Sequence, residues 1–282
     1  MTRNDEAGSR RIAMPGGPST EDRYDRLVAA EFAAQPVAPA RPLAESDLER
    51  LPAPVQRFVH RSGAIGRPRV QNVRVEFDAQ MWRKPGGAPM QATTVQYNFF
   101  DRPTRLFLMK ARMFGLPVRA LHVYAREQAT FTVRVASLLN MVDQRGDEIS
   151  AAETVTVLND MCFLAPGSLI DPRLAWELLD DRSVTVTFSN GPRRVAATLL
   201  FNDRDELVDF HSDDRPDSST GRFRPMRWST PISDYRDIGG YNLATRGEVV
   251  YAYPDGPFTY GRFTLRSIAY DVPGPTPPRA QP

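Results

Sequence analysis

The sequence predicts an α+β protein with a large curved antiparallel β-sheet, a half-barrel of about eleven strands around a central helix, preceded by an N-terminal helical lead-in. Alternation of apolar and polar residues recurs along most of the chain, and turns rich in Gly and Pro separate the alternating runs. One strongly apolar helical segment interrupts them near the middle. Strands and helices do not alternate regularly, which argues against a doubly wound parallel sheet.

The composition is that of an ordinary globular protein. The chain has 282 residues, of which 41% are hydrophobic and 25% charged, so it can bury a sizeable core. A net charge of +2 gives no basic field, and we expect no nucleic-acid partner. No run approaches the roughly 18 apolar residues of a transmembrane segment, and no apolar signal segment opens the chain. We therefore expect a cytoplasmic protein.

Three regions are expected along the chain. Residues 1–45 should be largely disordered, except for a helix at 20–34 with Thr20 as its N-cap. Residues 46–271 should form a single β-rich domain. The proline-rich residues 272–282 should form a disordered tail.

The domain is expected to open with a helical lead-in and continue as strands. A capping box at Ser46 starts the lead-in, and Gly63 ends it. From Val73 to Met81 apolar residues occupy every second position, which predicts a half-buried strand. Asn190-Gly191 predicts a tight hairpin turn. Further strands are expected at 90–100, 105–113, 118–125, 129–136, 183–189, 193–201, 206–212, 222–238, 241–253 and 258–270.

The central helix is expected between the two groups of strands, from Ser150 to Ala165. Ser150 and Glu153 form a capping box, and Pro166 ends the segment. Little polar surface remains around this helix. A helix this apolar is buried, or it lines an apolar space.

The closing meander, Ser233 to Asp271, carries a family resemblance. An uncharacterised bacterial family of unknown function shows the motifs D-Y-R-x-x-G-G and T-R-G-E, which this chain matches with Asp234-Tyr235-Arg236, Gly239-Gly240 and Thr245-Arg246-Gly247-Glu248. The resemblance covers about residues 50–270 and supplies no activity. We expect structural roles: positive φ angles at the glycines, and pairing of Arg236 with a carboxylate such as Glu248 across the ladder.

The combination of strands, glycine turns and a buried central helix is also similar, at the level of fold, to LolA-type lipoprotein-carrier half-barrels. That resemblance implies an incomplete barrel wrapped around a helix, with acyl chains held in the concave face. Fold similarity alone does not assign a function.

A hydrophobic groove for an apolar small molecule or lipid is the site that we expect. Leu106 to Met109 are apolar on both faces of their strand, so a helix or a ligand must cover the second face. Methionine is unbranched and adaptable, which suits apolar pockets. The expected lining residues are Met81, Phe107, Met109, Met113, Leu158, Met161 and Trp228. Plain core packing is the alternative explanation for these residues.

Other candidate sites have weaker chemical support. Asp209, His211 and Asp213 alternate on one strand, but residues two apart lie about 7 Å from each other, too far for one ion. Cys162, the only cysteine, lies in an apolar segment and should be an inert buried thiol. His122 could act as a general base, but no nucleophile motif accompanies it. We therefore expect no catalytic residue, metal or cofactor.

Two other functions remain open from the sequence. The chain could be an enzyme, if His122, Tyr124 and a carboxylate converge on one cavity. It could also be a protein-interaction domain whose terminal segments act as tether and bait. The oligomeric state and the identity of any ligand are left open.

Overall fold

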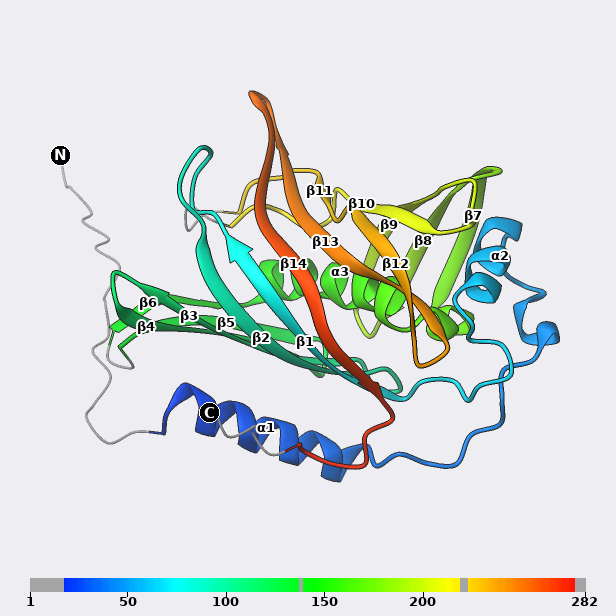
Figure 1. Cartoon of the computed structure of the whole chain (residues 1–282), viewed down its shortest axis with the longest axis horizontal. Coiled ribbons are helices and arrows are strands. Elements are labelled where there is room, and N and C mark those ends of the chain that lie inside the picture. Colours follow the sequence, from blue (N-terminus) through cyan, green and yellow to red (C-terminus); the bar gives the residue numbers. More distant parts are fainter. Residues whose placement is uncertain (1–17, 137–138, 219–222, 277–282) are drawn as a thin grey trace.

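The computed structural model describes residues 18–136, 139–218 and 223–276, and these form a curved antiparallel sheet that wraps around one helix without closing (Figure 1). The predicted fold class is confirmed, although the sheet has 14 strands rather than about eleven. Of the segments expected to be disordered, 1–45 outside its helix and 272–282, residues 1–17 and 277–282 lie outside the described residues.

The strands follow the expected sequence ranges closely in most places. They are β1 (Asn72–Met81), β2 (Met90–Phe99), β3 (Thr104–Met113), β4 (Leu116–Ala125), β5 (Gln128–Val135), β6 (Leu139–Arg145), β7 (Leu174–Asp180), β8 (Ser183–Asn190), β9 (Arg193–Phe201), β10 (Leu207–Ser212), β11 (Trp228–Ser229), β12 (Ile232–Ile238), β13 (Tyr241–Tyr253) and β14 (Gly256–Tyr270).

The order of the strands in the sheet is β6-β5-β4-β3-β2-β1-β14-β13-β11-β10-β9-β8-β7, with β12 paired to β13. Two meanders, β1 to β6 and β7 to β10, are therefore joined through the closing hairpin β13–β14. The junction depends on the pairing of β1 with β14, which sets Val73 opposite Tyr270.

Three sequence expectations about strands were wrong. The edge strands β6 and β7 were not expected, because neither segment alternates cleanly between apolar and polar residues. The single strand expected at 222–238 is instead divided into β11 and β12, which both pair with β13. Pro231 stands between them, and a proline cannot donate a hydrogen bond to a ladder.

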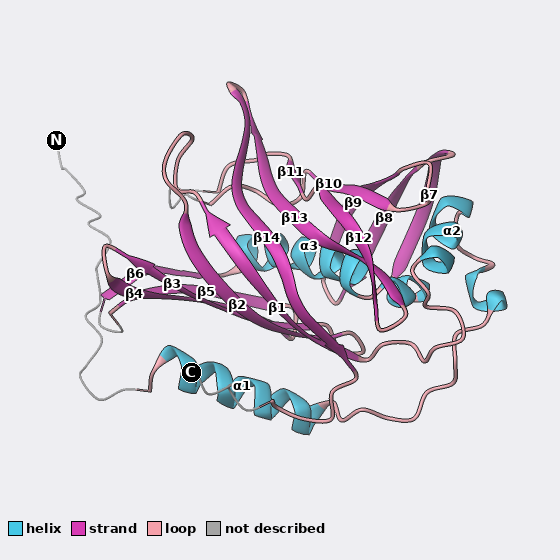
Figure 2. Cartoon of the chain, viewed as in Figure 1, coloured by secondary structure: helices cyan, strands magenta, loops and turns pink. Residues whose placement is uncertain are grey.

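Helix α3 (Asp147–Leu164) lies in the hollow of the sheet (Figure 2), and most of its side chains are buried. It begins at Asp147 rather than Ser150, and its N-cap is Gly146. The hydroxyl of Ser150 donates to the Gly146 carbonyl (2.7 Å) and accepts from the backbone N–H of Ala129 (2.9 Å). Ser150 thus fastens the helix to β5 instead of forming the expected capping box.

Helix α1 (Thr20–Ala34) covers the convex face of the sheet, and its bounds match the expected helix. Its N-cap is Ser19, not Thr20: Ser19 and Asp22 exchange reciprocal side-chain-to-backbone hydrogen bonds of 3.0 Å. Leu106 and Leu108 of β3 lie in the cluster that packs under α1. The helix therefore covers one apolar face of β3 and leaves Phe107 and Met109 on the concave face.

A second helical group covers one end of the sheet. It consists of the 3₁₀ helix η1 (Glu45–Leu48), helix α2 (Ala53–Arg61) and the 3₁₀ helix η2 (Pro166–Ile170). Helix α2 turns Val55, Phe58 and Val59 into the main core. None of the helices within the described ranges has both the length and the hydropathy for a bilayer crossing.

Candidate functional site

Two connected spaces lie between α3 and the concave face of the sheet. The inner one is a cavity of about 160 Å³ against α3, and the outer one is an open groove of about 870 Å³ that reaches the β1–β2 and β13–β14 hairpins. Both are lined by Met81, Phe107, Met109, His122, Glu153, Arg215 and Tyr260. These shared residues place the two spaces side by side between the surface and the helix.

The expected lining residues divide into two groups. Met81, Phe107, Met109 and Trp228 line the inner cavity, together with further aromatic side chains of β1, α3 and β14. Leu158 and Met161 do not line it, because they are fully buried in the main core. Met113 lines neither space, although it packs further along β3 in the same apolar cluster as Phe107 and Met109.

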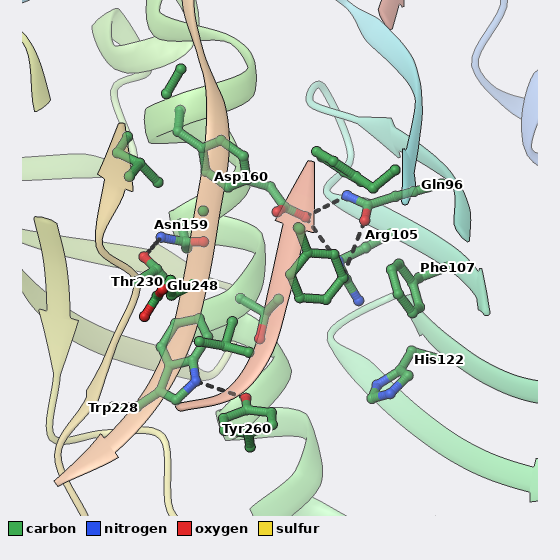
Figure 3. A pocket seen from close by; sticks show the side chains of 18 of the residues that line it. Gln96, Arg105, Phe107, His122, Asn159, Asp160, Trp228, Thr230, Glu248 and Tyr260 are labelled. Atoms are coloured by element: carbon green, nitrogen blue, oxygen red, sulfur yellow. Dashed lines mark hydrogen bonds and ion pairs between the residues drawn. The ribbon is translucent and has the colours of Figure 1, made fainter. Parts of the chain in front are cut away.

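A buried ionic cluster forms the floor of the inner cavity, which the sequence interpretation missed (Figure 3). The guanidinium of Arg105 donates from Nε to Asp160 Oδ2 at 2.8 Å, and its Nη1 lies 3.3 Å from Glu153 Oε2. Gln96 and Asn98 of β2 also donate to Asp160 Oδ2, each at 2.8 Å. Three donors on one carboxylate oxygen hold this side of the cluster in a fixed geometry.

A second buried arginine enters the cluster from the loop after β10. Arg215 donates to the hydroxyl groups of Thr156 (3.0 Å) and Tyr251 (2.6 Å), and its Nη2 lies 3.5 Å from Glu153 Oε1. Its guanidinium also lies over the ring of Trp228, 4.5 Å from the centroid. Glu153 therefore lies between two guanidinium groups, one on each side of the cavity floor.

The charges of the cluster are set by burial and by these arginines. Burial alone raises the pKa of Glu153, but His122, Arg105 and Arg215 oppose it and bring the pKa to about 2. Burial raises the pKa of Asp160, although Arg105 and Asn98 stabilise its ionised form. Glu153 is thus the firmly ionised carboxylate of the site.

His122 of β4 lines both spaces beside this cluster. Its ring stacks on Phe131, with centroids 3.8 Å apart, and packs edge-on against Phe107 at 5.7 Å. Burial lowers the pKa of His122, although Glu153 favours the protonated form. Nδ1 lies 3.4 Å from Glu153 Oε1 but makes no hydrogen bond with a described residue. A neutral imidazole with a free nitrogen can accept a hydrogen bond from a ligand.

The constellation expected of an enzyme forms only in part. His122 and Glu153 meet at the cavity, but the fully buried Tyr124 bonds through its hydroxyl group to Thr154 (3.0 Å) and Asn190 (2.8 Å). Cys162 is buried, and burial raises the pKa of its thiol. Among the described residues, no group of three or more His, Cys, Asp or Glu side chains could hold a metal ion.

The family-motif residues hold the β12–β13 hairpin. Gly239 and Gly240 have φ angles of 63° and 84°, as expected for the turn, and a Cβ on Gly240 would collide with Arg67. Arg236 pairs with Asp234 (2.9 Å) instead of Glu248, because the register places it opposite Leu243.

The remaining motif residues connect this hairpin to the core and to β14. Glu248 faces Arg262 across β13–β14 and pairs with it at 2.8 Å. The Tyr235 hydroxyl group donates to the Leu207 carbonyl at 2.8 Å, and Arg246 approaches Asp234 at 3.4 Å. Arg246 and Glu248 also line the inner cavity, so part of the motif borders the site.

One pattern in the sequence could have revealed the ionic cluster. Thr156 follows Glu153 by three residues and Asp160 follows it by seven. This spacing places the three side chains on one face of a largely apolar helix. Carboxylates in the interior require partners. Their spacing therefore indicated a polar site against α3, although not which strands would supply the arginines.

A family model described as "Family of unknown function (DUF6544)" matches residues 41–263. No curated protein matches the chain. Among solved structures, a LolA superfamily protein from Nitrosomonas europaea is similar with a TM-score of 0.43 and 13% identity, over 76% of this chain and 92% of that chain. A putative outer membrane lipoprotein-sorting protein domain from Vibrio parahaemolyticus is similar with a TM-score of 0.42 and 7% identity, over 71% and 85%. The predicted resemblances, to a family of unknown function and distantly to LolA-type proteins, are both found.

Proposed function

Since the chain belongs to DUF6544, a family of unknown function, we propose from the site itself that it binds an amphipathic ligand in the concave face of its sheet. The apolar part of the ligand occupies the groove along Met109 and Phe107. Its polar head group lies at the cavity floor, beside Arg105, Arg215 and His122.

The observation that supports this proposal is that the apolar groove and the polar cavity lie side by side and share seven lining residues. An open groove of about 870 Å³ lies within the size range of ligand sites, roughly 300–1,000 Å³. The cavity beside its inner end holds two guanidinium groups, and Arg105 and Arg215 each make three hydrogen bonds with described residues, out of five N–H groups. Spare donors beside an apolar groove fit a molecule with one polar end.

The energetics favour a chain-like ligand. Each methylene group moved from water into the groove contributes about 0.8 kcal/mol, before the cost of association is subtracted. The head group adds orientation more than affinity, because Glu153 and Asp160 already compensate the two arginines.

The test is to extract the natively purified protein with organic solvent and to identify bound molecules by mass spectrometry. Binding of an apolar fluorescent probe is measured in parallel. Met109→Trp fills the groove and should lower probe affinity about tenfold or more, whereas Met113→Trp is a matched control on the same strand face, outside both spaces. A protein without extractable ligand that also fails to bind the probe would refute the proposal.

A further inference from the structure

The turn between β3 and β4 exposes an aromatic side chain in a strained backbone conformation. Phe114 has a φ of 52° and is followed by Gly115 with a φ of 79°, so both central residues are left-handed, as in a type I′ turn. Asn is preferred at the first of these positions, and a bulky residue there is an outlier. The Phe114 side chain is 95% exposed, so no packing within the chain offsets the strain.

Other exposed apolar side chains lie at the same end of the sheet. Leu116 is the first residue of β4, and Leu139 and Met141 lie at the start of β6. About half of each of these three side chains is exposed. The starts of β4 and β6 lie on either side of the end of β5, because Val135 pairs with both Val118 and Leu139, and the Ala136 N–H donates to the Pro117 carbonyl at 2.8 Å. We call Phe114, Leu116, Leu139 and Met141 the apolar tip.

The strands around the apolar tip are basic, and the carboxylate of Glu21, which reaches β4 from α1, pairs with Arg119. Residues 79–100, 102–126 and 128–142 contain no Asp or Glu, although acidic residues are common elsewhere. The only two lysines of the chain, Lys84 and Lys110, lie in these stretches. Arg83 donates to Met113 Sδ at 3.6 Å, and Arg112 to the Gly115 carbonyl at 3.2 Å, so both keep their charge close to the tip. None of these four cations forms an ion pair with a described residue.

The apolar tip continues into the proposed ligand groove. Met113, Val118 and Val135 belong to one apolar cluster with Phe107 and Met109, which line the groove. Lys84 and Arg83 line the groove at its outer end. An apolar strip therefore runs along the concave face from the buried cavity to the exposed turn, with cations beside its outer end.

We propose that this end of the sheet docks on the surface of a lipid bilayer that contains anionic headgroups. Phe114 and Leu116 enter the interface between headgroups and acyl chains, and Lys84, Lys110, Arg83 and Arg112 contact the headgroups. In this orientation the outer end of the groove faces the bilayer. Phe114, Leu116, Lys110 and Arg112 line neither ligand space, so tests at these residues do not depend on the proposed ligand.

The shape and composition of the tip favour a membrane over a protein partner. The exposed apolar residues are only four, one on a turn and three at the starts of β4 and β6, whereas stable protein interfaces need about 1,000 Å² of complementary surface. Lysine is depleted in protein interfaces but interacts well with anionic lipid. An aromatic residue on a projecting turn beside cations matches the preferences of the membrane–water interface.

The experiment is cosedimentation of the full chain with vesicles of phosphatidylcholine, with and without phosphatidylglycerol. We expect binding only to the anionic vesicles, weakened by added salt. Phe114→Asn should lower the partition coefficient about tenfold to a hundredfold, and Lys84→Glu and Lys110→Glu about fivefold or more each. Because Asn suits the left-handed turn better than Phe, Phe114→Asn should unfold at the same or a higher denaturant concentration than the wild type.

Leu178→Asn and Leu179→Asn are matched controls, since these two leucines are also about half exposed but lie on the edge strand β7. They should leave vesicle binding unchanged. Failure to bind anionic vesicles, equal binding to neutral vesicles, or equal losses in the β7 controls would each refute the proposal. So would a concentration-dependent dimer that Phe114→Asn dissociates, because the tip would then serve contact between copies of the chain.

Discussion

Glu153 is the residue whose replacement tests the buried cluster most directly. Its side chain is 1% exposed and lies 3.3 Å from Arg105 Nη1 and 3.5 Å from Arg215 Nη2. Glu153→Gln keeps the shape of the side chain but removes its charge. Arg105 would keep its ion pair with Asp160, whereas Arg215 would lose the carboxylate 3.5 Å from its Nη2, and the carboxamide would turn an N–H donor toward one of the two guanidinium groups.

The loss of folding stability expected for Glu153→Gln is the same by two arguments. Breaking a buried ion pair by removing one partner costs about 3–5 kcal/mol. The pKa of Glu153 falls from 4.5 to about 2 on folding, which at 1.36 kcal/mol per unit corresponds to about 3 kcal/mol at neutral pH. His122 contributes to this shift only while it is protonated, so the second figure is an upper value. We expect Glu153→Gln to destabilise the protein by about 3 kcal/mol at pH 7.

The assay is urea unfolding of both proteins across a pH series. Because folding lowers the pKa of Glu153, its stabilisation is complete above pH 4.5 and disappears as the pH falls toward 2. The stability difference between wild type and Glu153→Gln should shrink over that window, while titrations common to both proteins largely cancel. Exposed Glu177 on β7 supplies the control Glu177→Gln, which should stay within about 0.5 kcal/mol of wild type. A difference below about 1 kcal/mol at pH 7, or one that grows as the pH falls, would contradict the reasoning.

Two further predictions concern the main core. Because burial raises the pKa of Cys162 and hides its sulfur, a thiol reagent should modify the native protein far more slowly than the urea-unfolded chain; equal rates would show that α3 is accessible. Leu158→Ala should cost about 2–5 kcal/mol in urea unfolding, because Leu158 is fully buried in the core, but it should not change probe binding at the groove. If Leu158→Ala lowered probe affinity by more than its unfolded fraction explains, Leu158 would belong to the binding site, contrary to the prediction.

Local structure could be predicted from the sequence wherever short-range patterns decide it. The helix at 20–34 and the strand at 241–253 have the expected bounds, because caps, turn glycines and alternation act within a few residues. The same reasoning missed β6 and β7, whose pairing depends on the neighbouring strand and not on their own pattern. It also misplaced two N-caps: Ser19 caps α1 in place of its neighbour Thr20, and Gly146 precedes α3, where the Ser150 hydroxyl donates to the Gly146 carbonyl instead of capping.

By itself the sequence determined that the chain builds a large antiparallel sheet with a buried helix and an adaptable apolar face. Only the tertiary structure decided which face of α3 meets that sheet. Leu158 and Met161 turn to the core, while Glu153 and Asp160 turn to the cavity and meet Arg105, far away in the sequence. Carboxylates tolerate burial only beside their partners, and the register of β2, β3 and β4 brings those partners together. Local patterns do not contain that long-range register.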